Sequence, residues 1–315
     1  MDGLRALSAF AVVLFHCHHP YFSAGDRGVD VFFVLSGFLI TRILLSQEKI
    51  DLRAFWSARI RRLVPALLVV AAACLIAAPI FAIGEAVTLR ETVYALSYTM
   101  NFAMAAGHRS NPLLHTWSLA QEMQFYLLWP LLVPALARAK HPRAILLLVW
   151  LLMTSARTVI ASFDGHFAYC SPLMHASGLI LGALICFCRP SPKLLGLSGM
   201  GLIGAGLAIG DSQAAASYGI ALTEIGAALL IADIVANASI NKRILSAPLL
   251  VGVGRISYGI YLWHFPLVML LDPFPWAKIV VVPLASVLLA WVSDRFIESQ
   301  FRNRDRRIPA EKFSN

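Results

Sequence analysis

The strongest constraint on this chain comes from its apolar runs, which recur along the whole sequence and are long enough to cross a bilayer. A bilayer core of about 30 Å needs roughly 20 consecutive, mostly apolar residues in a helix. Because 59% of the 315 residues are hydrophobic and only 14% are charged, a soluble domain is excluded. We predict ten spans, at residues 4–20, 29–46, 63–82, 117–137, 144–162, 171–188, 194–210, 217–236, 249–271 and 276–297.

The basic residues predict how these spans are oriented. With the N-terminus in the cytoplasm, 17 of the 26 Lys and Arg residues fall in inner loops or in the C-terminal tail, and 4 fall outside. This pattern predicts that both termini are cytoplasmic and that the number of spans is even. The net charge of +9 lies in short clusters between apolar runs, where it meets lipid headgroups. No nucleic-acid-binding motif accompanies it, so we expect membrane lipids and no nucleic acid as partners.

We therefore predict an all-α, polytopic integral membrane protein of the inner (cytoplasmic) membrane, with about ten transmembrane helices. Residues 1–300 are expected to form a single domain, and residues 301–315 a short basic cytoplasmic tail. Residues 83–116 are less apolar, and a full crossing there would place the basic cluster at 138–143 outside. We expect an interfacial or re-entrant segment on the outer side, with its backbone satisfied by protein or water.

Two polar residues of the first span suggest a site. Arg5 and His16 are eleven residues apart, which on a helix places them on nearly the same face, separated by about 16 Å. That distance is close to the reach of a pantetheine arm, so an anionic nucleotide near Arg5 could present a thioester to His16. The alternative is an Arg that reaches the inner headgroups and an interfacial His, like the neighbouring His18 and His19.

Polar residues of three later spans also call for partners, because a charge at mid-bilayer costs roughly 2.5–3.5 kcal/mol on insertion scales. Asp30, at a depth similar to that of His16, could orient a catalytic His or simply cap its helix. Glu122 should point inward to a partner. The remaining candidates for the substrate site or its surroundings are Ser36, His115, Trp117, Ser118 and Tyr126 with, in the ninth span, Tyr261 and His264.

The segment after the second span reads FWSARIRRLVP at residues 55–65 and is expected to be a cytoplasmic loop. Its arginines, Arg59 and Arg62 among them, fit ordinary positive-inside charge or a clamp for the phosphates of coenzyme A. The sequence holds no Walker A loop, HExxH zinc motif, GxSxG elbow or Rossmann fingerprint, so we predict no metal site and no permanently bound cofactor.

These motifs resemble acyltransferase family 3, the membrane acyltransferases that O-acylate cell-surface glycans. The matching segments, in order, are DGLRALSAFAVVLFH (2–16), GVDVFFVLSGFLITR (28–42), FWSARIRRLVPAL (55–67), HTWSLAQEMQFYLLWPLL (115–132) and SYGIYLWHFPLV (257–268). The resemblance implies a ten-span fold, a catalytic His16 paired with Arg5, and a cytoplasmic Arg-x-x-Arg formed by Arg59 and Arg62. A second family carboxylate in the fourth span is Met123 here, so Glu122 stands alone.

The resemblance implies that the chain transfers an acyl group, usually acetyl, from cytoplasmic acyl-CoA to a hydroxyl of a sugar or glycan. His16 would act as general base, helped by Asp30 or Glu122, and Arg5, Arg59 and Arg62 would hold the donor. The acceptor could be a polysaccharide, a lipid-linked sugar or a small glycoside. The alternative is a transporter or flippase for an acyl or glycan carrier, since buried His, Asp and Glu also build proton relays. The oligomeric state is left open.

Overall fold

The computed structural model describes residues 1–77, 89–108, 111–188, 195–209, 213–236 and 239–302. These residues form helices joined by short turns, and no strand occurs among them, so the all-α prediction is confirmed. The longer helices are α1 (Asp2–His16), α2 (Gly28–Leu45), α3 (Leu52–Ala77), α6 (Trp117–Arg138), α7 (Pro142–Ala161), α11 (Leu195–Ala208), α12 (Gln213–Ala236), α15 (Ser257–Leu270) and α16 (Pro275–Ser293). The shorter ones are η1 (Gly25–Arg27), α4 (Leu89–Leu96), α5 (Met100–Ala105), η2 (Leu114–Thr116), α8 (Gly165–Cys170), α9 (Pro172–His175), α10 (Ser177–Ile185), α13 (Ile240–Leu245), α14 (Pro248–Arg255), η3 (Asp294–Glu298) and α17 (Ser299–Arg302).

Every predicted span overlaps helical structure within the described residues, but residues 78–82, 194 and 210 of the predicted spans lie outside them, and two spans are interrupted. The span at 171–188 is divided at Ala176 into α9 and α10, and the span at 249–271 is divided at Ile256 into α14 and α15. Among the described residues, five helices are long and apolar enough to cross a bilayer: Gly25–Leu45, Leu52–Ala77, Pro142–Ala161, Ser217–Ala236 and Pro275–Phe301. The count of ten spans and the cytoplasmic position of both termini stay predictions.

The first helix is shorter than predicted, and this places His16 in its last turn. The predicted span ran to residue 20, whereas α1 ends at His16. His18 follows with φ of 55°, the left-handed conformation that commonly ends a helix. His16 therefore lies at the negative end of the α1 dipole.

The basic segment predicted as a loop is helical instead. α3 begins at Leu52, and the Asp51 side chain caps it by accepting a hydrogen bond from the Ala54 backbone N–H (2.9 Å). The residues that follow are mostly good helix formers, and charge does not prevent a helix from forming outside the apolar core. Arg59 and Arg62 are consequently three residues apart on one helix, which brings them to the same face.

The segment at 83–116, predicted not to cross the membrane, contains only short helices in its described part. Residues 78–88 and 109–110 lie outside the described residues. α4 and α5 have 8 and 6 residues, far fewer than a crossing needs. α4 packs against α3, and α5 packs against α6. The described part of this segment therefore lies against these two helices. Its position on the outer side stays a prediction.

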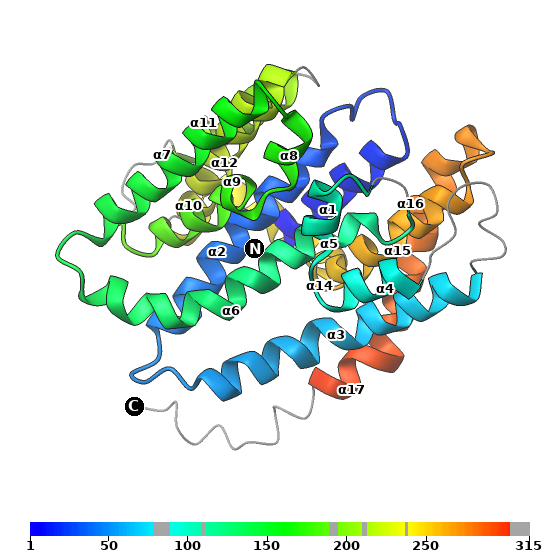
Figure 1. The fold of residues 1–315 in the computed structure, drawn as a ribbon, viewed down its shortest axis with the longest axis horizontal. Helices are drawn as coiled ribbons and strands as arrows, with labels where there is room; N and C mark the ends of the chain where they lie inside the picture. Colours follow the sequence, from blue (N-terminus) through cyan, green and yellow to red (C-terminus); the bar gives the residue numbers. More distant parts are fainter. Residues whose placement is uncertain (78–88, 109–110, 189–194, 210–212, 237–238, 303–315) are drawn as a thin grey trace.

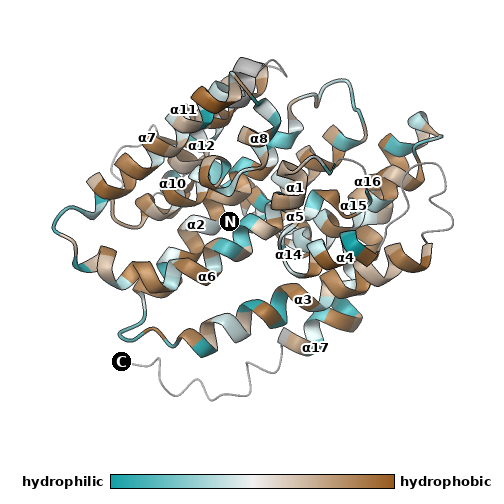
Figure 2. Cartoon of the chain, viewed as in Figure 1, coloured by the Kyte–Doolittle hydropathy of each residue, from teal (hydrophilic) through white to brown (hydrophobic). Residues whose placement is uncertain are grey.

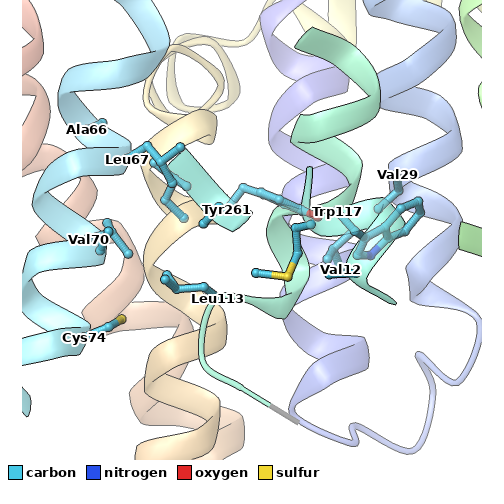
Figure 3. Close-up of a cluster of buried hydrophobic side chains, with 14 of the residues drawn as sticks. Val12, Val29, Ala66, Leu67, Val70, Cys74, Leu113, Trp117 and Tyr261 are labelled. Carbon is cyan, nitrogen blue, oxygen red and sulfur yellow. The ribbon is translucent and has the colours of Figure 1, made fainter. Parts of the chain in front are cut away.

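Helices α1 and α2 form the centre of the bundle (Figure 1). α2 contacts α10, α12 and α6, whereas α1 contacts α14, α15 and α16. A buried cluster joins the central pair to α3, α6 and α15 through Val12, Val29, Leu67, Trp117 and Tyr261 (Figure 3). Peripheral helices such as α7 and α16 keep leucines exposed, as expected of a surface that faces lipid (Figure 2).

Small residues allow the central helices to approach closely. A Cβ atom added at Gly37 of α2 would overlap the Leu179 carbonyl of α10, and one added at Gly182 of α10 would overlap the Val34 carbonyl of α2. Membrane helices lack a hydrophobic driving force between them, so such backbone contact carries much of the association.

We expect Gly182→Ala to lower the thermal midpoint of the detergent-solubilised protein, because the added methyl group must separate α2 from α10. Overpacking of this kind costs about 1–3 kcal/mol. Gly201→Ala in α11 is the matched control, since a Cβ there meets nothing within 4 Å. Equal midpoints for the two variants would contradict this account of the α2–α10 contact.

Candidate functional site

A cavity of about 280 Å³ collects most of the predicted site residues. Its walls come from α1, α2, α3, α6 and α15, the same helices that the buried cluster joins. The predicted residues that line it are Arg5, Ser36, Arg59, Arg62, Ser118, Glu122, Tyr126 and Tyr261. Sequence segments separated by up to about 250 residues thus meet around one space.

Three guanidinium groups line this cavity. Arg5 comes from α1, and Arg59 and Arg62 come from α3. α3 is held in place from two sides: Trp56 donates to the Tyr126 carbonyl of α6 (3.0 Å), and Tyr258 of α15 donates to the Leu63 carbonyl (2.7 Å). These bonds fix the arginine face of α3 against the cavity.

Glu122 is the carboxylate of the cavity. Ser36 of α2 donates to one of its oxygens (2.7 Å), and Tyr126 donates to the other (3.0 Å). The first of these hydrogen bonds joins α6 to α2. No hydrogen bond connects it to His16 in the described part of the chain.

Ser118 and Tyr261 also line the cavity. Their hydroxyl oxygens are 2.6 Å apart, and the Tyr261 hydroxyl also donates to the His115 carbonyl (2.9 Å). The latter bond joins α15 to η2, directly before α6. The Tyr261 carbonyl oxygen also contacts His264, so Tyr261 links the cavity to a cluster of histidines.

Three predicted histidines cluster beyond Tyr261. His264 Nδ1 is 2.6 Å from the Tyr261 carbonyl oxygen, and His264 Nε2 is 3.2 Å from His16 Nδ1. The ring centroids of His16 and His115 lie 5.1 and 5.3 Å from that of His264. His264 is fully buried, whereas His16 keeps part of its surface exposed. Among the described residues, no group of three His, Cys, Asp or Glu side chains is arranged to hold a metal ion.

Asp30 does not orient His16, contrary to one interpretation of the sequence. Its carboxylate is 2.7 Å from His175 Nε2, and His175 Nδ1 is 2.6 Å from the Tyr169 carbonyl oxygen. Both ring nitrogens of His175 are therefore within hydrogen-bond distance of an oxygen, and the ring is held between Asp30 and the Tyr169 carbonyl. The other interpretation, a helix cap, does not hold either, because α2 has no side-chain cap.

Trp117 also lies away from the cavity lining. Its ring packs against the rings of Tyr169 (4.9 Å) and His175 (5.2 Å), and it belongs to the buried cluster of Figure 3. Trp117 and the Asp30–His175 pair form one buried unit near the start of α6 that supports the site from outside.

Sequence reasoning missed several polar residues of the bundle. Tyr258 lines the cavity at the start of α15. Elsewhere, buried Arg157 of α7 pairs with Glu224 of α12 (3.4 Å), whose carboxylate also accepts hydrogen bonds from Trp150 and Ser177. Both charges lie inside predicted spans, and that position alone was a signal that they need partners.

The sequence matches the family described as an acyltransferase domain over residues 1–295. This chain is therefore a member of that acyltransferase family, as its resemblance to acyltransferase family 3 predicted.

Two relatives are named for O-acetyl transfer. The chain is 30% identical to the O-acetyltransferase OatA of Staphylococcus aureus (strain NCTC 8325 / PS 47), over 96% of this chain and 57% of the relative. It is 32% identical to the peptidoglycan O-acetyltransferase OatA of Listeria monocytogenes serovar 1/2a, over 96% of this chain and 55% of the relative. The chain thus spans little more than half the length of these curated relatives. No solved structure matches it.

We expect Asp30→Asn and His175→Gln each to lower the free energy of unfolding in detergent, because each weakens a buried hydrogen bond and leaves the other residue without its native partner. The double variant should lose little more than either single variant, with a coupling energy on the order of 1–3 kcal/mol. Strictly additive losses would contradict the pairing.

Proposed function

We propose that this chain is a membrane-embedded O-acyltransferase that moves an acetyl group from cytoplasmic acyl-CoA to a hydroxyl of a cell-wall glycan, with His16 as the general base. One observation carries the proposal: a line of polar side chains leads from the three cavity arginines, past Glu122 and Tyr261, to the histidine cluster. A recognition site for anions is thereby connected to a group that can transfer protons.

The cavity suits the slender part of the donor. At about 280 Å³ it lies at the lower limit of ligand pockets, which hold roughly 300–1,000 Å³. It would accept the acylated pantetheine arm and leave the nucleotide at the arginine end, where guanidinium groups bind phosphates in a bidentate manner. The break at Ile256 also directs the N-terminus of α15 toward the cavity through Ser257, and the dipole there adds positive charge.

Helix α1 sets the distance between recognition and chemistry. Arg5 lines the cavity and His16 ends the same helix, about 16 Å away along its axis. An extended pantetheine arm covers a distance of this order. The helix acts as a rigid spacer, so the thioester is presented near the histidine cluster when the phosphates are held at the other end.

The proposed reaction is an acyl transfer with one proton returned. His16 removes the proton of the acceptor hydroxyl while its oxygen bonds to the thioester carbonyl carbon. The carbon–sulfur bond then breaks, and His16 returns the proton to the leaving thiolate, which departs as coenzyme A. General acid–base help of this kind contributes about 10²–10⁴-fold to a rate.

The acceptor is inferred from the relatives. The Listeria protein is named a peptidoglycan O-acetyltransferase, so a peptidoglycan hydroxyl is the acceptor that we propose for this chain. His16 is partly exposed at the end of α1 that the charge pattern places outward. A glycan approaching from the cell surface would meet it there.

We expect His16→Ala to abolish transfer of labelled acetyl from acetyl-CoA to peptidoglycan fragments in inside-out membrane vesicles, with a rate loss of about 10²-fold or more. The wild-type protein should release free coenzyme A and acetylate a hydroxyl in equal amounts. A carrier would move its cargo without releasing coenzyme A. Full activity of an inserted His16→Ala variant would exclude His16 as the base.

We expect Arg59→Gln to raise KM for acetyl-CoA, because it removes a guanidinium group from the cavity, while kcat changes little. The matched control is Arg61→Gln, two positions along α3. Arg61 does not line the cavity and donates instead to Ser57 (2.7 Å). The KM increase should shrink at high salt, where phosphate–arginine attraction is screened. An equal change in KM for both variants would argue against a phosphate clamp.

A further inference from the structure

The histidine cluster contains an arrangement that fixes where the protons lie. His264 Nδ1 is 2.6 Å from the Tyr261 carbonyl oxygen, which can only accept a hydrogen bond, so Nδ1 carries the hydrogen. In the neutral ring, Nε2 of His264 then holds a lone pair. That atom lies 3.2 Å from His16 Nδ1.

His16 Nδ1 faces a second acceptor as well. The Val12 carbonyl oxygen, one helical turn earlier in α1, is 3.0 Å away. Because the two neighbours of His16 Nδ1 are both acceptors, this nitrogen must carry the hydrogen of the neutral ring. The lone pair of His16 is then on Nε2, the nitrogen that makes no hydrogen bond within the described part of the chain.

We propose that His264 is a positioning residue that holds His16 in the tautomer whose Nε2 is free to act as the base. This inference rests on the proposed function, in which His16 removes a proton. In serine hydrolases a buried aspartate holds the catalytic histidine in its tautomer. Here a second imidazole, itself fixed by the Tyr261 carbonyl, takes that place.

The pair also limits its own charge. When His16 accepts a proton at Nε2, its Nδ1–H bond to His264 becomes charge-assisted and stabilises the cation. A second proton on His264 would set N–H against N–H at 3.2 Å, so the pair accepts only one proton. The titratable groups that face this pair are His115 from η2, Tyr261 from α15 and His18 after α1.

The test compares His264→Leu with His264→Gln, using the full chain in detergent, acetyl-CoA as donor and a purified peptidoglycan fragment as acceptor. Gln can present its amide oxygen to His16 Nδ1–H, whereas Leu offers no acceptor. We expect Leu to lower kcat at least tenfold with an unchanged KM for acetyl-CoA, and Gln to recover most of the loss. His166→Leu is the matched control, because His166 bonds to the Met104 carbonyl away from the cluster.

The pH profile separates positioning from packing. Without the His264 acceptor the His16 cation is less stable, so the acid limb of kcat should move to lower pH in the Leu variant and stay in place in the control. Where Leu does not fold, His264→Asn replaces it, since Asn is polar but too short to reach His16. A Leu variant with wild-type kcat, or equal losses in Leu and Gln with an unmoved limb, would overturn the inference.

Parallel measurement of His16→Ala keeps the two proposals apart. If His16→Ala is inactive and His264→Leu is fully active, only the positioning role fails. If His16→Ala keeps full activity, the proposed base itself is wrong, whatever His264→Leu does. Acetyl-CoA binding and a single symmetric elution peak show in each case that the variant is folded.

Discussion

The structure depends on one constraint: a polar side chain inside a bilayer has no water to bind, so the protein must supply its partner. The described bundle meets this constraint with cross-helix pairs. The Glu122 carboxyl group accepts hydrogen bonds from Ser36 and Tyr126, and buried Arg157 forms an ion pair with Glu224. Each pair ties helices together that apolar contact alone would not hold in one register. The groups that would bind a substrate therefore also determine how the helices pack.

The sequence predicted the apolar helices well because hydropathy over about 20 residues is a strong signal. The prediction failed where hydropathy and helix propensity indicate different structures. The charges of Arg59 and Arg62 lower the local hydropathy, so the start of α3 was taken for a loop although its residues favour a helix. The breaks at Ala176 and Ile256 were missed although polar residues and glycines flank both, because the apolar runs on either side together have the length of one span.

The candidate site was predictable as a set of residues and not as a set of contacts. Ordered motifs indicated which residues matter, and most of them do line one cavity. The sequence could not predict which residues contact one another. An Asp at a given depth in the membrane has the same sequence pattern whether it contacts His16 or His175. Depth along a helix follows from residue number, but rotation about the helix axis toward one neighbour or another depends on packing. That choice decides which histidine Asp30 contacts.

The absence of a carboxylate beside His16, among the described residues, has a chemical consequence for the proposed reaction. Asp30 is engaged by His175, and Glu122 is engaged by Ser36 and Tyr126. A carboxylate at 3 Å in a medium of low dielectric would hold the imidazolium as an ion pair and resist the return of its proton. A neutral imidazole stabilises that cation less, so the proton passes more easily to the leaving thiolate.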